Sequence, residues 1–229
     1  MDDASTWARA RSPAQKRARE EEVLDAAARL LSTRPFASIS LSDLAGEVSF
    51  SRANLYKYFG SKEEVYLALM ARSAERFARS ITRALAEDAA ARRIVPGTSG
   101  AAKVMARLWI RELASRGELL QLMSMAGTVL ERSCSDEAII TAKTRMAAGV
   151  TEHLLPFVGA FFPELDVDRG VALIQFLIVT ANGLFPMCGL DGRQRALLRD
   201  HGLAGMVMEF EPVYAQLVAS RLDALLAAV

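Results

Sequence analysis

The residues best suited to hold a polyanion gather in the first third of the chain, between Arg52 and Lys62. Both of these cations fall in the predicted first turns of helices, where a positive charge opposes the helix dipole at a small cost in stability. Between them, Tyr56, Lys57 and Tyr58 offer two hydroxyls and an ammonium that can donate hydrogen bonds to phosphate oxygens. The pattern favours a phosphate-binding surface. The alternative is an ordinary solvated face of long cationic side chains.

A second run of basic residues precedes this group. Between residues 9 and 19 the chain has five basic residues and no acidic one, although its formal net charge is only +1. A polyanionic partner would therefore meet a local basic patch rather than a basic protein. The run consists of Arg9, Arg11, Lys16, Arg17 and Arg19.

The sequence offers little for catalysis or for metal binding. The two histidines, His153 and His201, have no serine, cysteine or carboxylate at a spacing typical of a catalytic site. The two cysteines, Cys134 and Cys188, fit no metal-binding or redox spacing, and such low usage is typical of a reducing cytosol. We therefore predict no catalytic residue, no metal ligand and no cofactor.

Three predicted helices position the basic residues. The first begins at Pro13 and ends before Arg34, and it buries one apolar face. Ser40 opens the second with Asp43 in the capping-box position. The third covers 52–58, with Ser51 at its N-cap, and Gly60 is expected to end it through a positive φ. The apolar face of the first helix consists of Val23, Ala27, Leu30 and Leu31.

The second and third helices carry the pattern of a helix-turn-helix. Two helices that cross at a steep angle need a small residue where they approach most closely, and Ala45 takes that position. Apolar residues at Leu44, Val48, Phe50 and Leu55 would seal the junction. The outer helix would then be free to enter a DNA major groove.

The rest of the chain predicts only helices. Ser61 and Glu64 form another capping box, which opens a long helix from Lys62 to about Arg93. A linker rich in Pro and Gly follows at 95–100, and no segment alternates with the period of a strand. The fold class is therefore all-α. Further helices are expected over 101–116, 118–132, 136–158, 167–189 and 203–228.

The N-terminal segment resembles the tetracycline-repressor (TetR-like) regulators. The resemblance rests on Leu44-Ala45 through Ser51 and on NLYKYFGSKEE at 54–64, and it covers about the first 70 residues. It implies a three-helix DNA-binding domain over 1–60 and a larger helical ligand-sensing and dimerisation domain over 61–229. The implied function is a ligand-responsive transcriptional regulator, a repressor by analogy, that binds a palindromic operator in double-stranded DNA as a homodimer. An all-α enzyme for a hydrophobic substrate, or an interaction module that no longer binds DNA, are the alternatives.

The resemblance also assigns roles within the motif. Leu55 and Phe59 would be core residues. Two interpretations of Asn54 stay open, a capping residue or a reader of adenine. The sequence departs from the family where a glycine is usual, at Ser49 in the turn and at Ala53 in the recognition helix. Arg52, Ala53, Asn54 and Lys57 would lie near base edges, while Ser51, Tyr56, Tyr58 and Lys62 would bind phosphates.

The segment 101–190 is rich in methionine and aromatic residues. Such residues at helical spacing form a core in most proteins, but methionine-rich linings also adapt to varied apolar ligands. We therefore predict a pocket for a small apolar effector within this half of the chain. Its expected lining is Met105, Trp109, Met123, His153, Phe157, Phe176 and Asn182.

Two apolar stretches predict the homodimer. Residues 170–190 carry no charge, and we interpret them as a helix buried in a core or at a subunit interface rather than as a membrane span. The last helix, within 203–228, presents a broad apolar stripe that includes Val207, Phe210, Tyr214, Val218, Leu222 and Leu225. Paired with their copies, the two helices would form the four-helix dimer interface that the resemblance implies, in a cytoplasmic protein. The alternative is that a single domain buries both faces internally.

Overall fold

A computed structural model of the chain describes residues 13–49 and 51–227. Every regular element within those ranges is a helix, which confirms the all-α prediction. The basic residues Arg9 and Arg11, and the apolar Phe50 of the predicted motif, lie outside the described residues.

The N-terminal helices follow the sequence closely. Helix α1 (Pro13–Thr33) ends before Arg34, and its predicted face of Val23, Ala27, Leu30 and Leu31 is buried. A short 3₁₀ turn (Phe36–Ser38) leads to α2 (Leu41–Gly46) and then to α3 (Arg52–Leu55). The chain leaves α3 through hydrogen-bonded turns up to Phe59, so regular helix is shorter than the predicted 52–58.

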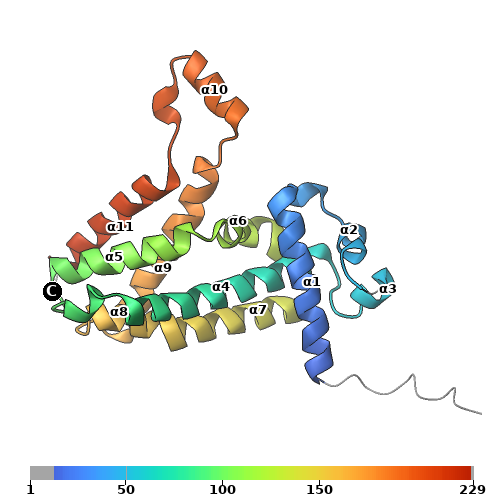
Figure 1. Ribbon diagram of the computed structural model, residues 1–229, viewed down its shortest axis with the longest axis horizontal. Helices are drawn as coiled ribbons and strands as arrows, with labels where there is room; N and C mark the ends of the chain where they lie inside the picture. Colours follow the sequence, from blue (N-terminus) through green and yellow to red (C-terminus); the bar gives the residue numbers. More distant parts are fainter. Residues whose placement is uncertain (1–12, 50, 228–229) are drawn as a thin grey trace, which may run out of the picture.

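The remaining helices build an elongated bundle beside this unit (Figure 1). Helices α4 and α7 run side by side along it, and α5 packs against α11. The helices are α4 (Lys62–Glu87), α5 (Ser99–Ala114), α6 (Gly117–Met125), α7 (Asp136–Gly149), α8 (Leu155–Phe161), α9 (Val167–Cys188), α10 (Gly192–Asp200) and α11 (Phe210–Leu226). Short 3₁₀ turns lie at Ala91–Arg93, Glu131–Ser133 and Ala204–Met206, and π-helical turns lie at Ala126–Leu130 and Val150–Leu154.

Several predicted boundaries were wrong. Helix α4 ends at Glu87 rather than near Arg93, because the Asp88 carboxylate accepts hydrogen bonds from the backbone of Ala90 and Ala91 and turns the chain. Gly60 does not adopt a positive φ; within the described residues, the glycines that do are Gly97 and Gly202. The predicted helices 118–132 and 136–158 are each interrupted by a π-helical turn.

Helix α10 was not predicted. It begins with a capping box in which Asp191 and Gln194 exchange hydrogen bonds, and it buries none of its residues. Figure 1 shows it projecting away from the bundle between α9 and α11. The apolar residues of this helix are three consecutive ones, Ala196, Leu197 and Leu198, and a single short run shows no helical period, which is why the sequence pattern missed it.

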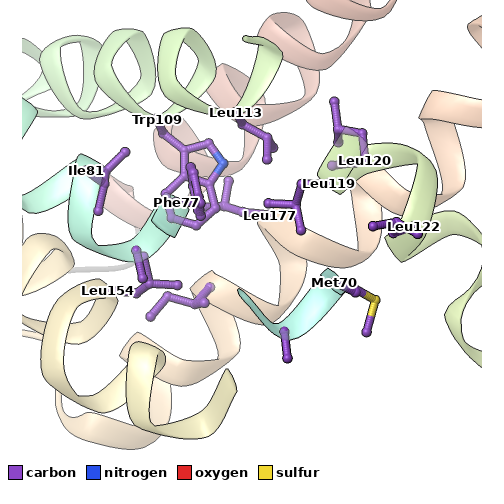
Figure 2. Close-up of a cluster of buried hydrophobic side chains, with 14 of the residues drawn as sticks. Met70, Phe77, Ile81, Trp109, Leu113, Leu119, Leu120, Leu122, Leu154 and Leu177 are labelled. Carbon is purple, nitrogen blue, oxygen red and sulfur yellow. The ribbon is translucent and has the colours of Figure 1, made fainter. Parts of the chain in front are cut away.

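The core of the bundle is apolar and centred on Trp109, which is fully buried (Figure 2). The ring edge of Phe77 from α4 meets Trp109 from α5, with ring centroids 5.1 Å apart. The indole Nε1 of Trp109 donates to the Tyr214 hydroxyl at 2.9 Å, and that hydroxyl donates to the Leu177 carbonyl at 2.8 Å. This chain of hydrogen bonds ties α5, α11 and α9 together.

Candidate nucleic-acid interface

The turn between α2 and α3 is held by the first helix. The backbone N–H of Ser49 donates to Glu22 Oε1 at 2.7 Å, and Arg19 donates both to Glu22 (3.0 Å) and to the Ser49 hydroxyl (2.6 Å). The hydrogen bond from the Ser49 backbone is the main reason why the pKa of Glu22 is lowered. Helix α1 therefore fixes the angle at which α3 leaves α2.

A buried cation joins the same helix to α4. Arg72 is 3% exposed and lies 2.8 Å from the carboxylates of both Glu21 and Asp25. The Tyr66 hydroxyl, also on α4, donates to the Ala27 carbonyl at 3.3 Å. Because a buried charge is costly without a partner, these ion pairs fix α1 on α4.

Helix α2 begins with the predicted capping box. The Ser40 backbone N–H donates to Asp43 at 2.8 Å, and the Asp43 N–H donates to the Ser40 hydroxyl at 3.2 Å. Arg34 also contacts the Asp43 carboxylate at 2.8 Å. The Ser40 hydroxyl, followed by the Arg34 guanidinium, holds the pKa of Asp43 far below its usual range.

Helix α3 presents most of the predicted DNA-binding residues to solvent. Ser51 occupies the N-cap position, but its side chain makes no capping hydrogen bond within the described structure. The Ser51 hydroxyl therefore does not form the predicted capping hydrogen bond, and it can face a ligand. Five of the eight predicted residues are exposed on this surface: Ser51, Arg52, Ala53, Tyr56 and Lys57.

Two contacts orient the cations of α3. Arg52 lies 5.6 Å from the centre of the Tyr56 ring and donates to its hydroxyl at 3.1 Å. Lys57 Nζ donates to Asn54 Oδ1 at 3.1 Å. Asn54 is half-buried and lies inside the helix, so it does not cap α3. These exposed groups are held in place by neighbours one turn away rather than by the core.

The other residues of the motif point inward to different degrees. Leu55 is fully buried and Phe59 is 8% exposed, as expected of core residues. Tyr58 is half-buried beside them. The inner side of α3 therefore packs on the domain, which leaves its outer side available for a partner.

The ammonium of Lys62 has partners inside the protein. Its Nζ donates to the carbonyls of Ile39 (2.8 Å) and Phe36 (3.2 Å), and it lies 4.4 Å from the centre of the Phe36 ring. Carbonyls and an aromatic face explain a cation at the start of α4 without any external anion. A phosphate contact by Lys62 remains a prediction from the resemblance.

An open groove of about 450 Å³ runs between this domain and α7. Lys16 of α1 and Lys57 line it together, so the basic part of α1 lies on the same side as α3. Glu64 and Ser135 line the groove as well, and they are in direct contact with each other. The sequence pattern gave no signal of this groove, because its walls come from three distant segments of the chain, 16–24, 57–71 and 135–145.

A small cavity of about 100 Å³ lies within the bundle. Its walls are almost entirely apolar and come from α4, α5, α6, α7 and α9 and from the π-helical turn after α7. Of the predicted pocket residues, Trp109 and Met123 line it. The sequence missed the other walls: Ala74, Phe77, Ala78, Leu113, Leu119, Met146, Gly149, Val150, Leu154 and Ile178.

The remaining predicted pocket residues do not line this cavity. Met105 and Phe157 are buried in the surrounding core. His153 is half-buried, with Nδ1 3.4 Å from the Thr82 hydroxyl, and Phe176 lies beneath the guanidinium of Arg221. The Asn182 Oδ1 is buried without a partner within the described residues. The predicted set is therefore spread over the bundle rather than gathered around one space.

Among the described residues, no group of three or more His, Cys, Asp or Glu side chains could hold a metal ion. Helix α9 alone among the described helices is long and apolar enough to cross a membrane, and a third of that stretch is buried within the chain. This is weak support for a membrane span, since the core helix of a soluble protein meets the same criteria.

Two family models match the chain one after the other. Residues 23–69 match the bacterial regulatory proteins of the tetR family, and residues 71–228 match the tetracyclin repressor-like C-terminal domain. The second match alone covers more than half of the chain. The two matches meet within α4.

Curated relatives resemble the N-terminal part. The chain is 50% identical over 52 residues to the HTH-type transcriptional regulator EthR of Mycolicibacterium smegmatis, and 48% identical over 54 residues to EthR of Mycobacterium tuberculosis. These segments are 23% and 24% of this chain, and they span only about a quarter of the relatives (24% and 25%).

Solved structures are similar to this chain over most of its length. The TetR family repressor AlkX from Dietzia sp. is 16% identical, with a TM-score of 0.47, over 92% of this chain and 96% of that one. The fatty acid degradation regulator FadR from Bacillus halodurans is 17% identical, with the same TM-score, over 92% and 97%. These similarities are too low to carry an argument about function.

Proposed function

Because the chain belongs to the tetR family of bacterial regulatory proteins, we propose that it is a cytoplasmic repressor that binds an inverted-repeat operator and responds to a small apolar effector. The observation that carries the proposal is the exposed outer side of α3, with Arg52, Tyr56 and Lys57 held in place at one end of the molecule. Because the matched family consists of regulatory proteins, we propose a regulator rather than an enzyme.

Binding to DNA follows from this surface. Arginine and lysine supply donors for phosphates and for guanine edges in the major groove. Helix α1 and the Glu22–Ser49 contact set the direction of α3, so its cations would reach the groove in a fixed orientation. In a dimer, two such helices about 34–36 Å apart would enter successive major grooves.

The direct test is selection of bound fragments from random duplexes by the full chain. We expect an inverted repeat to be enriched. Substituting Arg52→Ala and Lys57→Ala together should lower affinity for the selected duplex by at least about 30-fold, since each contact to a base or phosphate contributes on the order of 1–3 kcal/mol.

The matched control is the double substitution of Arg83→Ala and Lys103→Ala. These side chains carry the same charges and are exposed on α4 and α5, away from α3. The control should bind the duplex as the unsubstituted chain does. Equal losses in both double variants would mean that overall charge, not α3, determines binding.

We propose the apolar cavity as the core of the effector site. Its volume of about 100 Å³ is smaller than the roughly 300–1,000 Å³ of ordinary ligand sites, so an effector must displace some of the lining. Met123 and Met146 are flexible enough to move, and Val150 and Leu154 belong to a π-helical turn. Such turns are frequent at functional sites.

Filling the cavity tests this assignment. Ala74→Leu adds a side chain to the cavity wall, whereas Ala86→Leu adds the same atoms on the exposed side of the same helix. We expect apolar molecules that raise the melting temperature of the original chain to lose that effect with Ala74→Leu only. A retained effect with both substitutions would place the effector elsewhere.

The dimer interface requires a correction to the predicted stripe. Tyr214, Val218, Leu222 and Leu225 of α11 are buried, and α11 packs against α5 and α9 of its own chain. They are therefore unavailable to a second copy. Helix α9 offers an uncharged, exposed stripe instead: Ala172, Gln175, Val179, Gly183 and Met187.

We propose that this α9 stripe meets its copy across a two-fold axis, together with the exposed side of α11, where Leu217 lies. Val179, 67% exposed, is the best position to test. Val179→Glu should convert a dimer into a monomer in sedimentation experiments, because two buried carboxylates would face each other. Ile140→Glu on α7, where the side chain is 65% exposed, is the control and should leave the dimer intact.

A further inference from the structure

The Glu64 carboxylate connects two distant parts of the chain. Its Oε2 accepts a hydrogen bond from the Gly60 backbone N–H at 2.7 Å, at the end of the turn that follows α3. Its Oε1 accepts from the backbone N–H of Ser135 at 3.0 Å and from the Ser135 hydroxyl at 2.8 Å. The predicted capping box is thus half formed, because the Glu64 N–H donates to Ser61 but the carboxylate points elsewhere.

A second hydrogen bond strengthens the same connection. The Ser61 hydroxyl donates to the Ser133 carbonyl at 3.2 Å, two residues from the first contact. The residues 60–61 after the recognition helix are therefore joined to the residues 133–135 at two points. Elsewhere the open groove separates Lys57, Tyr58 and Phe59 from α7.

The other end of α7 reaches the cavity. Ser135 is the N-cap of α7, and its hydroxyl also accepts from the Ala138 backbone N–H at 3.3 Å. Met146 and Gly149, near the end of the helix, line the cavity about 20 Å away, given the rise of 1.5 Å per residue. Gly149 lies against α4, where an added Cβ would be in ordinary contact with Ala78 at 3.4 Å.

The hydrogen bonds of the Glu64 carboxylate are strong, but they break when their geometry changes. Partial burial alone would raise the pKa of the Glu64 carboxyl, but the hydrogen bonds from Ser135 and Gly60 outweigh burial and hold the pKa below its usual value. Glu64 is therefore charged at neutral pH, and hydrogen bonds to a charged acceptor are stronger than neutral ones. They also depend on a narrow geometry, so a small shift of α7 along α4 would weaken them.

We propose that Glu64 is a positioning residue that couples the first turn of α7 to the orientation of α3, so that an effector displacing α7 releases the recognition helix. The coupling rests on the proposed function, because it takes the cavity at the far end of α7 as the effector site. Glu64 touches neither DNA nor effector in this scheme. A movement of α7 would reach the turn at Gly60 through the hydrogen bonds of the Glu64 carboxylate.

Hydrogen exchange on the full chain tests the coupling without DNA or effector, so a failed operator selection would not affect the result. Ser135→Asp keeps an acceptor for the Ala138 N–H and so keeps α7 capped. It removes the hydroxyl donor and places a second negative charge beside Glu64. We expect amides of residues 57–61 to exchange about tenfold faster, although they are more than 70 residues away from the substitution.

The reciprocal variant is Glu64→Gln, which should accelerate exchange both at 57–61 and in the first turn of α7 by a similar factor. Glu63→Gln is the control, since Glu63 makes no hydrogen bond to Gly60 or Ser135 among the described contacts. It should change neither segment. The proposal is overturned if Ser135→Asp accelerates only α7, or if exchange rises evenly across all helices through a general loss of stability.

Discussion

The N-terminal helices and the helical bundle share one apolar core, but they differ in the contacts that fix their geometry. In the first unit, polar contacts join α1 to its neighbours, through Glu22 with Ser49 and Arg72 with Glu21, and the Ser40–Asp43 capping box begins α2. The bundle depends on apolar packing around Trp109 and contains a small cavity. Directional contacts define one geometry, whereas apolar packing can rearrange at modest cost. The division suits a rigid DNA-binding unit beside a sensor that adapts to a ligand.

The largest effect is expected at the centre of the bundle. Trp109→Ala should lower the free energy of unfolding by about 4 kcal/mol, because it leaves a large cavity and removes the hydrogen bond to Tyr214. Urea denaturation followed by circular dichroism would measure this. A loss below about 1 kcal/mol would show that the bundle is not organised around this side chain.

Substituting Arg72 tests the polar contacts between α1 and α4. Arg72→Ala should cost about 2 kcal/mol, less than a fully buried ion pair because Glu21 and Asp25 are about half exposed. The exposed Arg76, also near Glu21 at 3.8 Å, is the control and should cost little when changed to Ala. Equal costs for the two substitutions would contradict the role of the buried cation.

The capping box should contribute a smaller amount. Ser40→Ala removes the side-chain acceptor for the Asp43 N–H and should cost about 1 kcal/mol. Ser40→Thr keeps a hydroxyl and should restore most of that loss. Identical stability of the Ala variant and the original chain would mean that Arg34 alone holds Asp43.

The structure and the resemblance assign different partners to the Lys62 ammonium. Lys62→Met should cost about 1 kcal/mol of stability, because the carbonyls of Phe36 and Ile39 lose their donor. If the ammonium stays with those carbonyls, the salt dependence of DNA binding should not change. A salt slope flatter by about one unit would instead confirm the phosphate contact that the resemblance implies.

Acid should weaken the N-terminal unit gradually. The pKa values of Glu22, Asp43 and Glu64 are all lowered in the folded chain. Their contribution to stability is therefore complete above the unfolded values, near 4.5 for glutamate, and it is lost as the pH falls through the folded values. Urea titrations should give a constant free energy of unfolding between pH 7 and pH 5 and a decline below that. Glu22→Gln should make the decline shallower.

The sequence predicted what local spacing determines. The Ser40–Asp43 box and the buried Leu55 follow from residues within one or two helical turns, and both were predicted correctly. The cap of α10 had the same spacing, Asp191 with Gln194, but the helix has only one short apolar run and was missed. Local polar signals therefore need to be searched for even where hydrophobic periodicity is absent.

Contacts between distant residues could not be predicted. Glu22 and Ser49 are 27 residues apart, and Glu64 and Ser135 are 71 apart. Neither pair has a distinctive spacing in one sequence. The predicted pocket residues coincide with the cavity lining only in part for the same reason, since residue types alone could not tell that Phe157 faces the core while Gly149 faces the cavity.

The most direct test of the account is binding of the purified chain to a duplex of random sequence as salt is varied. We expect binding in dilute buffer, with the logarithm of the affinity falling linearly as the logarithm of the salt concentration rises. The double substitution of Arg52 and Lys57 should reduce that slope by about two units, whereas the Arg83 and Lys103 pair should not. No affinity for any duplex, even at the lowest salt, would contradict a DNA-binding role for α3.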